Sequence, residues 1–192
     1  GNGALVTQYW GGGDVDIADN TPVPINNTGA LCGVWDQTIK NWASFTNAPN
    51  TYAAWQDGSD RVARFRMHLP NISVSAYITV GADVVVHQIR DEVTAAGNFN
   101  QFFNFRANSP RTITLEPTPD GVPPMLGGSS DRTRGAIYTS NVRFAGTNGF
   151  LFIGGQNQVQ SASDGLSGTV IFDGTVANLY LNGGGSMNGV NE

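Results

Sequence analysis

The chain has 192 residues, enough for one domain with a real core and too few for two comfortable ones. Only 13% of the residues are charged, and the net charge of −5 disfavours nonspecific nucleic-acid binding, which needs clustered cations. Lysine occurs once, at Lys40, and glutamate three times, although these two residue types normally fill exposed helix faces. The composition therefore predicts an all-β protein.

The sequence also lacks the features of disulfide-bonded proteins and of membrane-spanning proteins. Cys32 is the single cysteine, so no disulfide can form within the chain. No apolar run is long enough for a transmembrane helix, and no basic-then-apolar segment typical of a secretion signal opens the sequence. We therefore expect no membrane span.

Residues 1–54 read as an irregular N-terminal arm, because they show no sustained hydrophobic period and are broken by Gly11–Gly13, Pro22 and Pro24. Within this arm, residues 36–45 could form one short helix with Asp36 as its N-cap. All four tryptophans of the chain lie in or next to the arm: Trp10, Trp35, Trp42 and Trp55. Large aromatics beside weak secondary structure favour anchoring of the arm to the domain or to a neighbouring copy.

The segment DVDIADN is the best candidate for an ion site in the sequence. It supplies the oxygen ligands that Ca²⁺ prefers, from Asp14, Asp16, Asp19 and Asn20. It does not match an EF-hand loop, because Ala18 stands where a ligand belongs and the required glycine is absent. We interpret the segment as an acidic loop and expect no metal or other cofactor, with calcium as the alternative.

Residues 71–90 give the clearest strand signal. Apolar and polar residues alternate from Ile72 to Val80, which is typical of a strand with one buried face. Gly81-Ala82-Asp83 can then turn the chain into the β-branched run Val84–Val86. This pattern predicts a central antiparallel hairpin.

Further strands follow at short spacing, separated by Asn-Gly and Asp-Gly turn signals. Their expected ranges are 61–69, 98–106, 111–116, 136–144, 150–153, 168–172 and 176–181. About eight strands without a helical period predict an antiparallel β-sandwich or jelly roll over residues 55–182, followed by a glycine-rich tail, residues 183–192. No repeat of fixed period is present, which argues against a solenoid or propeller.

Residues 117–135 form the longest irregular segment after the arm, rich in proline and glycine. A loop of this length in a compact domain is usually functional or disordered, and we interpret it as an ordered contact loop. Its candidate interface residues are Pro123, Pro124, Met125, Arg132 and Arg134.

Motifs for catalysis are missing from the sequence. There is no Gly-x-Ser-x-Gly, and His68 and His87 are the only histidines, too few for a closed zinc site with one cysteine. We expect His87 to be a part-buried structural residue and the pair Asp91-Glu92 to lie in a solvated turn. We predict a protein without enzymatic activity, the rival being a glycan-cleaving enzyme built from aspartates.

The composition resembles that of virion surface proteins such as capsid decoration proteins, fibre heads and spike tips, which are also lysine-poor and rich in Asn, Gly and Thr. It is similar, too, to bacterial adhesins and lectin modules. The first resemblance implies a structural protein of a virion surface or extracellular assembly that docks on itself and on other capsid proteins.

Charge distribution favours that assembly. Six aspartates crowd the first third of the chain, whereas its nine arginines run from Arg61 to Arg143, so neighbouring copies could dock on one another. We therefore predict a symmetric homo-oligomer, with a trimer as the preferred form. The alternative is a carbohydrate-binding module of lectin or adhesin type, in which exposed tryptophan, asparagine and aspartate bind a surface glycan.

Overall fold

The computed structural model describes residues 3–11, 32–44, 52–67, 73–93, 100–127, 134–138, 141–146, 150–153, 156–159, 171–172 and 179–181. These residues form 17 strands and no helix, so the prediction of an all-β protein is confirmed. Accordingly, no helix within the described ranges is long and apolar enough to cross a membrane.

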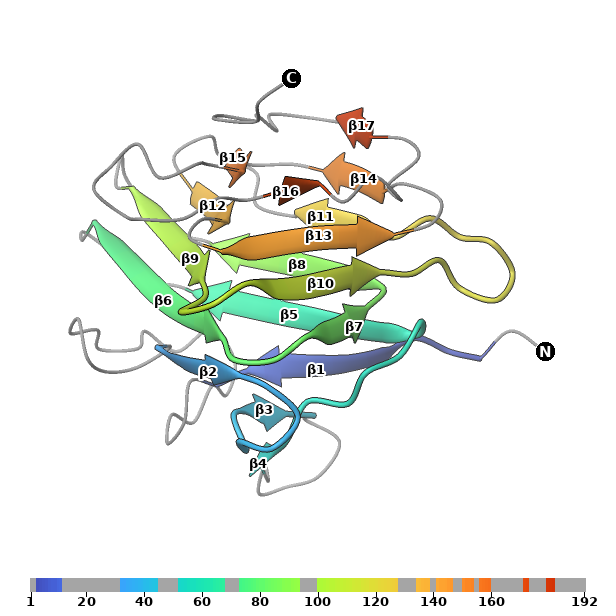
Figure 1. Ribbon diagram of the computed structural model, residues 1–192, viewed down its shortest axis with the longest axis horizontal. Coiled ribbons are helices and arrows are strands. Elements are labelled where there is room, and N and C mark those ends of the chain that lie inside the picture. The colour runs from blue at the N-terminus through green and yellow to red at the C-terminus, as the bar shows by residue number, and fades with distance from the viewer. Residues whose placement is uncertain are drawn as a thin grey trace.

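The strands form three sheets, seen in Figure 1. Sheet A contains, in spatial order, β17 (Leu179–Leu181), β14 (Phe150–Ile153), β11 (Met125–Gly127), β8 (Gln88–Val93), β5 (Arg61–Met67), β1 (Val6–Trp10), β3 (Trp42–Ala43) and β4 (Tyr52–Ala53). Sheet B contains β15 (Gln156–Val159), β12 (Arg134–Tyr138), β9 (Gln101–Arg106), β6 (Val74–Val80) and β2 (Gly33–Trp35). Sheet C contains β16 (Ile171–Phe172), β13 (Val142–Gly146), β10 (Arg111–Leu115) and β7 (Val84–Val86).

From β5 onward the chain visits sheets A, B and C in turn, so that each strand pairs in parallel with the strand three places later. This arrangement is a parallel β-solenoid. We call one turn of the chain through the three sheets a coil. One ladder of sheet A aligns Val62, Gln88, Met125 and Leu151, and the differences between these residue numbers give coil lengths of 26, 37 and 26 residues. Unequal coils explain why the sequence shows no fixed period, and the argument against a solenoid was wrong.

The predicted antiparallel sandwich or jelly roll is not confirmed. Among the described strand pairs, antiparallel pairing is confined to β1 with β3 and β3 with β4, at the N-terminal end of sheet A. A half-buried strand has the same alternation of apolar and polar residues in either orientation, so the pattern could not reveal the parallel pairing.

The central hairpin predicted within residues 71–90 is wrong as well. Strand β6 pairs with β2 and β9, whereas β7 pairs with β10 in another sheet. Gly81–Asp83 is a corner of the solenoid, where the Gly81 N–H donates to the Trp35 carbonyl at 2.9 Å. A Cβ on Gly81 would lie 2.5 Å from Val34 Cγ1, so this corner requires glycine for close packing and not for a reversal of the chain.

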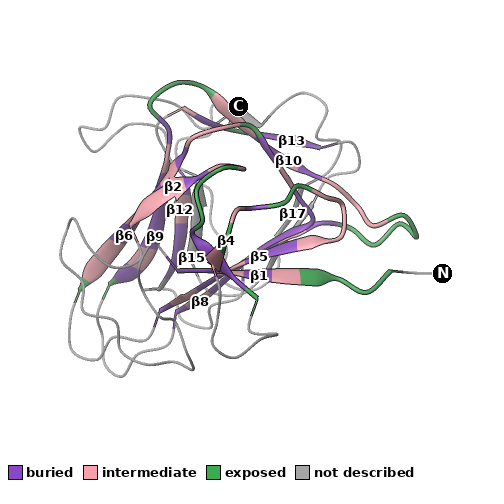
Figure 2. Cartoon of the chain, turned by 90° about the horizontal axis from the view of Figure 1, so that it is seen from below, coloured by how far each residue is buried: buried purple, intermediate pink, exposed green. Residues whose placement is uncertain are grey.

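The side-chain alternation predicted for single strands is confirmed wherever the structure describes it. In β5, Phe65 and Met67 are buried while Arg64 and Arg66 lie on the outer face. Likewise, Phe103 and Phe105 of β9 are fully buried. Figure 2 shows buried positions, in purple, on strands of all three sheets.

Aromatic rings stack through successive coils and fill the interior. Phe65 packs edge-on against Phe105 with ring centroids 4.9 Å apart, and Phe105 stacks on Tyr138 at 4.7 Å. Tyr138 in turn contacts Phe144 at 4.9 Å. Each such pair stabilises the fold by about 0.5–1.5 kcal/mol beyond its area burial. We refer to Phe65, Phe105, Tyr138 and Phe144 as the aromatic column.

Tryptophans close the N-terminal end of this column. Trp35 lies 5.7 Å from Phe65 between ring centroids, and Trp42 lies 5.4 Å from Phe65 and 4.8 Å from Trp55. Trp10 completes the cluster at 5.2 Å from Trp42. We call these four residues the tryptophan plug, because they cover the core where the first complete coil would otherwise expose it.

The described parts of the predicted arm extend the sheets. Strand β1 pairs in parallel with β5, and β2 pairs in parallel with β6, so they form a partial first coil. Asp57 ties this region to sheet C, because its Oδ1 accepts hydrogen bonds from Trp55 Nε1 at 2.9 Å and from the Val85 N–H at 2.8 Å. The glycine-rich tail, residues 183–192, lies outside the described residues.

The helix predicted for residues 36–45 is absent from the described part of that range, residues 36–44, since residues 36–39 form a bend and Trp42 begins β3. Asp36 nevertheless caps the bend: its Oδ1 accepts hydrogen bonds from the N–H groups of Thr38 at 2.9 Å and Ile39 at 2.8 Å. Burial alone would raise the pKa of the Asp36 carboxyl, but these hydrogen bonds and one from the Thr38 hydroxyl lower it. The resulting stabilisation is present above pH 3.8 and is lost as the pH falls through the lowered pKa.

The first testable prediction concerns the tryptophan plug. Replacing Trp35 with Ala should lower the free energy of unfolding by about 3–5 kcal/mol, because it opens a cavity among Trp42, Trp55 and Phe65. Denaturant unfolding followed by far-ultraviolet circular dichroism measures the loss. Replacing Ile39, whose side chain is 43% exposed, with Ala should change stability by no more than about 0.5 kcal/mol. Equal effects of the two substitutions would contradict the role of the plug.

Candidate functional site

The four tryptophans predicted as interface or binding residues lie inside this chain's own core. Their exposed fractions are 0% for Trp10, Trp35 and Trp42 and 1% for Trp55. In this conformation they are therefore not available to a glycan or to a neighbouring copy. They anchor the N-terminal segment to the domain, which is one of the two anchoring roles that the sequence favoured.

The remaining predicted site residues are scattered. Pro123 is exposed, Pro124 is buried and Met125 is half-buried at the start of β11. Arg134 begins β12. The other candidates lie outside the described residues: Arg132, His68 and the calcium candidates Asp14, Asp16, Asp19 and Asn20.

Two titratable residues, His87 and Asp91, lie fully buried in the core. His87, predicted to be part-buried, is fully buried at the corner between β7 and β8, with its Nδ1 2.7 Å from the Glu116 carbonyl oxygen. Asp91 lies in β8 with its side chain buried in the core of the protein, and the prediction that it lies in a solvated turn was wrong. Burial, followed by the charge of Asp91, raises the pKa of the Tyr138 phenol well above its usual value. Within the described residues, no group of three or more His, Cys, Asp and Glu side chains is placed to hold a metal ion.

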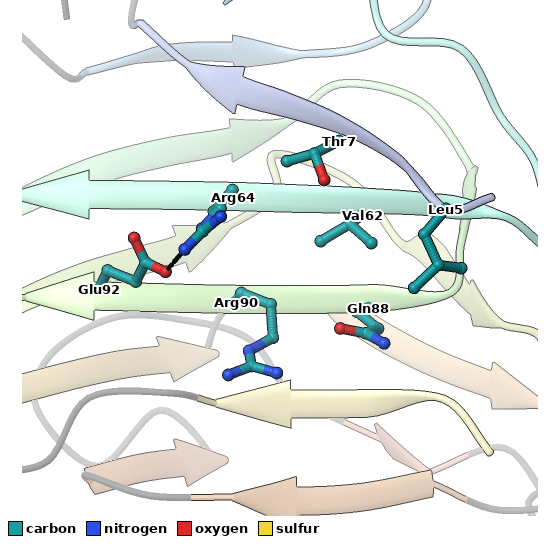
Figure 3. Close-up of a pocket in the computed structure, with 7 residues that line it drawn as sticks. All are labelled: Leu5, Thr7, Val62, Arg64, Gln88, Arg90 and Glu92. Atoms are coloured by element: carbon teal, nitrogen blue, oxygen red, sulfur yellow. Dashed lines mark hydrogen bonds and ion pairs between the residues drawn. The ribbon is translucent and has the colours of Figure 1, made fainter. Parts of the chain in front are cut away.

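The outer face of sheet A contains the best candidate site. Here β1, β5 and β8 present a groove of about 220 Å³, shown in Figure 3. Its lining residues are Leu5, Thr7, Val62, Arg64, Gln88, Arg90 and Glu92. We call this surface the sheet A groove. It combines two cations and one carboxylate with polar and apolar side chains.

At one end of the groove the charges are paired. Arg64 forms an ion pair with Glu92, with an Nε–Oε1 distance of 2.6 Å, and its NH1 donates to the Tyr9 hydroxyl at 3.3 Å. Arg66 approaches the other oxygen of Glu92 at 3.3 Å. Burial would lower the pKa of Arg64, but the hydrogen bond and charge of Glu92 outweigh it and raise the pKa. One glutamate therefore holds two arginines.

Arg90 differs from these two arginines, because among the described residues it has no ion-pair or hydrogen-bond partner. Its Nε atom is buried and without an acceptor. Parallel pairing places Arg90 beside Arg64 on one side and beside Gly127, which has no side chain, on the other. In Figure 3 the Arg90 side chain extends from β8 towards β11, away from the Arg64–Glu92 pair.

A second hollow, of about 310 Å³, lies at the corner between sheets C and A. It is lined by Gly3, Gly58, Ser59, Asp60, Thr118, Pro119 and Asp120, so the N-terminal segment lies against the loop between β10 and β11. This loop is ordered by its own hydrogen bonds, from the Gly121 N–H to the Thr118 carbonyl at 2.8 Å and from the Val122 N–H to the Thr118 hydroxyl at 3.0 Å.

Comparison of the chain with protein-family models, curated proteins and solved structures found no match. The candidate site is therefore interpreted from its geometry alone.

Sequence reasoning missed the sheet A groove. Arg64 and Arg90 are 26 positions apart in the chain, and neither carries a recognisable motif. The signal that could have found them is the outward register of each strand, since both arginines occupy polar positions in an apolar–polar alternation. That register identifies the face of each residue but not its neighbour in the next coil.

The charge pattern of the groove gives the second prediction. Replacing Glu92 with Gln leaves Arg64 and Arg66 without their shared carboxylate and should lower the free energy of unfolding by about 1 kcal/mol. Replacing Arg90 with Gln removes a like charge beside Arg64 and should leave stability unchanged or slightly higher. Urea unfolding in low and high salt measures both effects, and salt should shrink the Glu92 deficit. Equal losses in the two variants would refute this electrostatic account.

Proposed function

We propose that this chain is a non-enzymatic structural protein of a symmetric assembly, on a virion surface or in an extracellular assembly, that acts by docking on neighbouring subunits. The observation that supports this proposal is a set of exposed apolar side chains at the corner between sheets C and A. The parallel solenoid supplies a stiff body on which such a corner is presented at a fixed place.

The corner gathers three of the four large apolar side chains that are exposed among the described residues. Leu5 is 43% exposed, Val6 39% and Val122 44%. Leu5 and Val6 follow Gly3 in the chain, and Val122 follows Asp120, in the two segments that line the hollow. Figures 1 and 2 both show the N-terminal segment and this loop on the same side of the molecule. We call Leu5, Val6, Val122 and the exposed Pro123 the corner patch.

A second copy of the chain is the occupant we propose for the corner patch. Asp60 and Asp120 line the hollow beside it, whereas the outer face of sheet A carries Arg64, Arg66 and Arg90. An apolar centre with an acidic rim suits an oligomer interface, and opposite charges on two surfaces of one chain help neighbouring copies to orient. Cyclic symmetry follows when such a contact closes, and a trimer remains our preferred form.

The rival interpretation as a lectin that stacks sugars on exposed tryptophans finds no support at the indoles, because all four are at most 1% exposed. Any glycan would have to bind elsewhere on the surface.

The third prediction concerns this assembly. The wild-type protein should be a stable oligomer at roughly micromolar concentration, and the double substitution Leu5→Ser with Val122→Ser should shift it to monomer, because apolar contact area is lost. Light scattering coupled to size-exclusion chromatography gives the mass. The control is Ile39→Ser, which changes an equally exposed apolar residue outside the corner patch and should leave the mass unchanged.

A wild-type protein that stays monomeric up to roughly 1 mM would contradict the proposed self-association. So would an oligomer whose mass the double variant leaves unchanged, since the corner patch would then not be the interface.

A further inference from the structure

The ladder of sheet A concentrates positive charge at Arg90. Arg64 and Arg90 are direct partners in the parallel register of β5 and β8, where neighbouring strands lie about 4.8 Å apart. Like charges at such positions repel each other. Glu92 relieves Arg64 and Arg66 but leaves Arg90 without a counter-charge among the described residues. The groove therefore carries an excess of one positive charge.

The position of Arg90 favours an external anion over an internal partner. The residue is half-buried, its Nε is buried without an acceptor in the described part of the chain, and the next position in the ladder is Gly127, which supplies no side chain. A guanidinium carries five N–H donors in a planar fork that matches the two oxygens of a carboxylate. An anion bound at the guanidinium of Arg90 would relieve the repulsion between Arg64 and Arg90.

The rest of the groove is suited to a sugar ring. Gln88 and Thr7 offer amide and hydroxyl groups, which can donate to and accept from sugar hydroxyls. Val62 and Leu5 offer apolar surface for the C–H groups of a ring. A volume of about 220 Å³ accommodates a small ligand and lies below the usual range for drug-sized pockets.

The carboxylate of Glu92 narrows the choice of anion. It lines the same groove, so a doubly charged phosphate would be repelled more strongly than a singly charged carboxylate. A nucleic acid is further disfavoured by the net charge of −5.

We propose that the sheet A groove binds a uronic acid residue of an acidic glycan, with Arg90 holding the sugar carboxylate and Gln88 and Thr7 its hydroxyls. This site shares Leu5 with the corner patch, and its other lining residues lie outside that patch.

The test is isothermal titration calorimetry of the full chain with tetrasaccharides of mannuronate, galacturonate and glucuronate. At least one should bind with a Kd of roughly 1 mM or below. Its carboxyl-reduced counterpart, which keeps the ring and hydroxyls but lacks the charge, should bind at least about tenfold more weakly. Inorganic phosphate serves as the competing anion and should bind more weakly than the uronate.

Variants locate the site. Arg90→Gln should weaken binding at least about tenfold, and Arg90→Lys, which keeps the charge but loses the planar fork, should fall between it and the wild type. The matched control is Arg143→Gln, the same change at an exposed arginine of β13 in sheet C, which should leave the Kd within about twofold. In the wild type, the NMR signal of the Arg90 Nε–H should shift on titration, which needs no variant.

Three results would overturn the proposal: no binding of any of the three uronates at roughly 10 mM, binding of the carboxyl-reduced sugar as tightly as the uronate, or tighter binding of phosphate. Equal binding by wild type and Arg90→Gln would also overturn it. Because the titration is independent of mass measurements, failure here leaves the proposed assembly standing, and a monomeric protein that binds uronate leaves this inference standing.

Discussion

The aromatic column is the interaction on which the rest of this structure depends. In a parallel solenoid, each coil contacts only the coils beside it, so stability is transmitted through nearest-neighbour contacts. Phe65, Phe105 and Tyr138 provide those contacts in three successive coils, with ring centroids less than 5 Å apart at each step. A column of this kind exposes its last ring unless the chain covers it. The tryptophan plug provides that cover at the N-terminal end.

The same stacking determines what the outer faces can do. Residues in equivalent positions of successive coils become neighbours, so the polar face of one strand is combined with the polar face of the next. Arg64 and Arg90 are brought together in this way, while Glu92 is placed to pair with Arg64 and Arg66. The charge of the sheet A groove therefore depends on coil length, which decides which residues become neighbours, as well as on composition. A coil one residue longer would exchange inward and outward positions and turn Arg90 into the core.

The two proposed surfaces have different physical origins. The sheet A groove lies on regular strands, whose hydrogen-bonded ladder fixes the spacing of its side chains and suits recognition of a small, directional ligand. The corner patch lies mainly on an N-terminal segment and a loop, with only Val6 in a strand, and its exposed apolar side chains suit a broad contact with another subunit. Pro123 belongs to this patch, and it is the one predicted contact residue that the structure places at an exposed position within the described part of the loop.

The sequence by itself determined the all-β class and the inward or outward direction of most described side chains. Successive side chains of a strand point to opposite faces of the sheet, and this alternation can be followed without knowing the partner strand. It also indicated that the tryptophans anchor the N-terminal segment, but it underestimated the burial of His87, which is complete. It could not determine which strands are neighbours: parallel and antiparallel strands share one alternation, and the corner at Gly81–Asp83 has the composition of a hairpin turn. Only the tertiary structure decided that Arg64 and Arg90 lie side by side, since long-range register depends on coil lengths and core packing that no local pattern records.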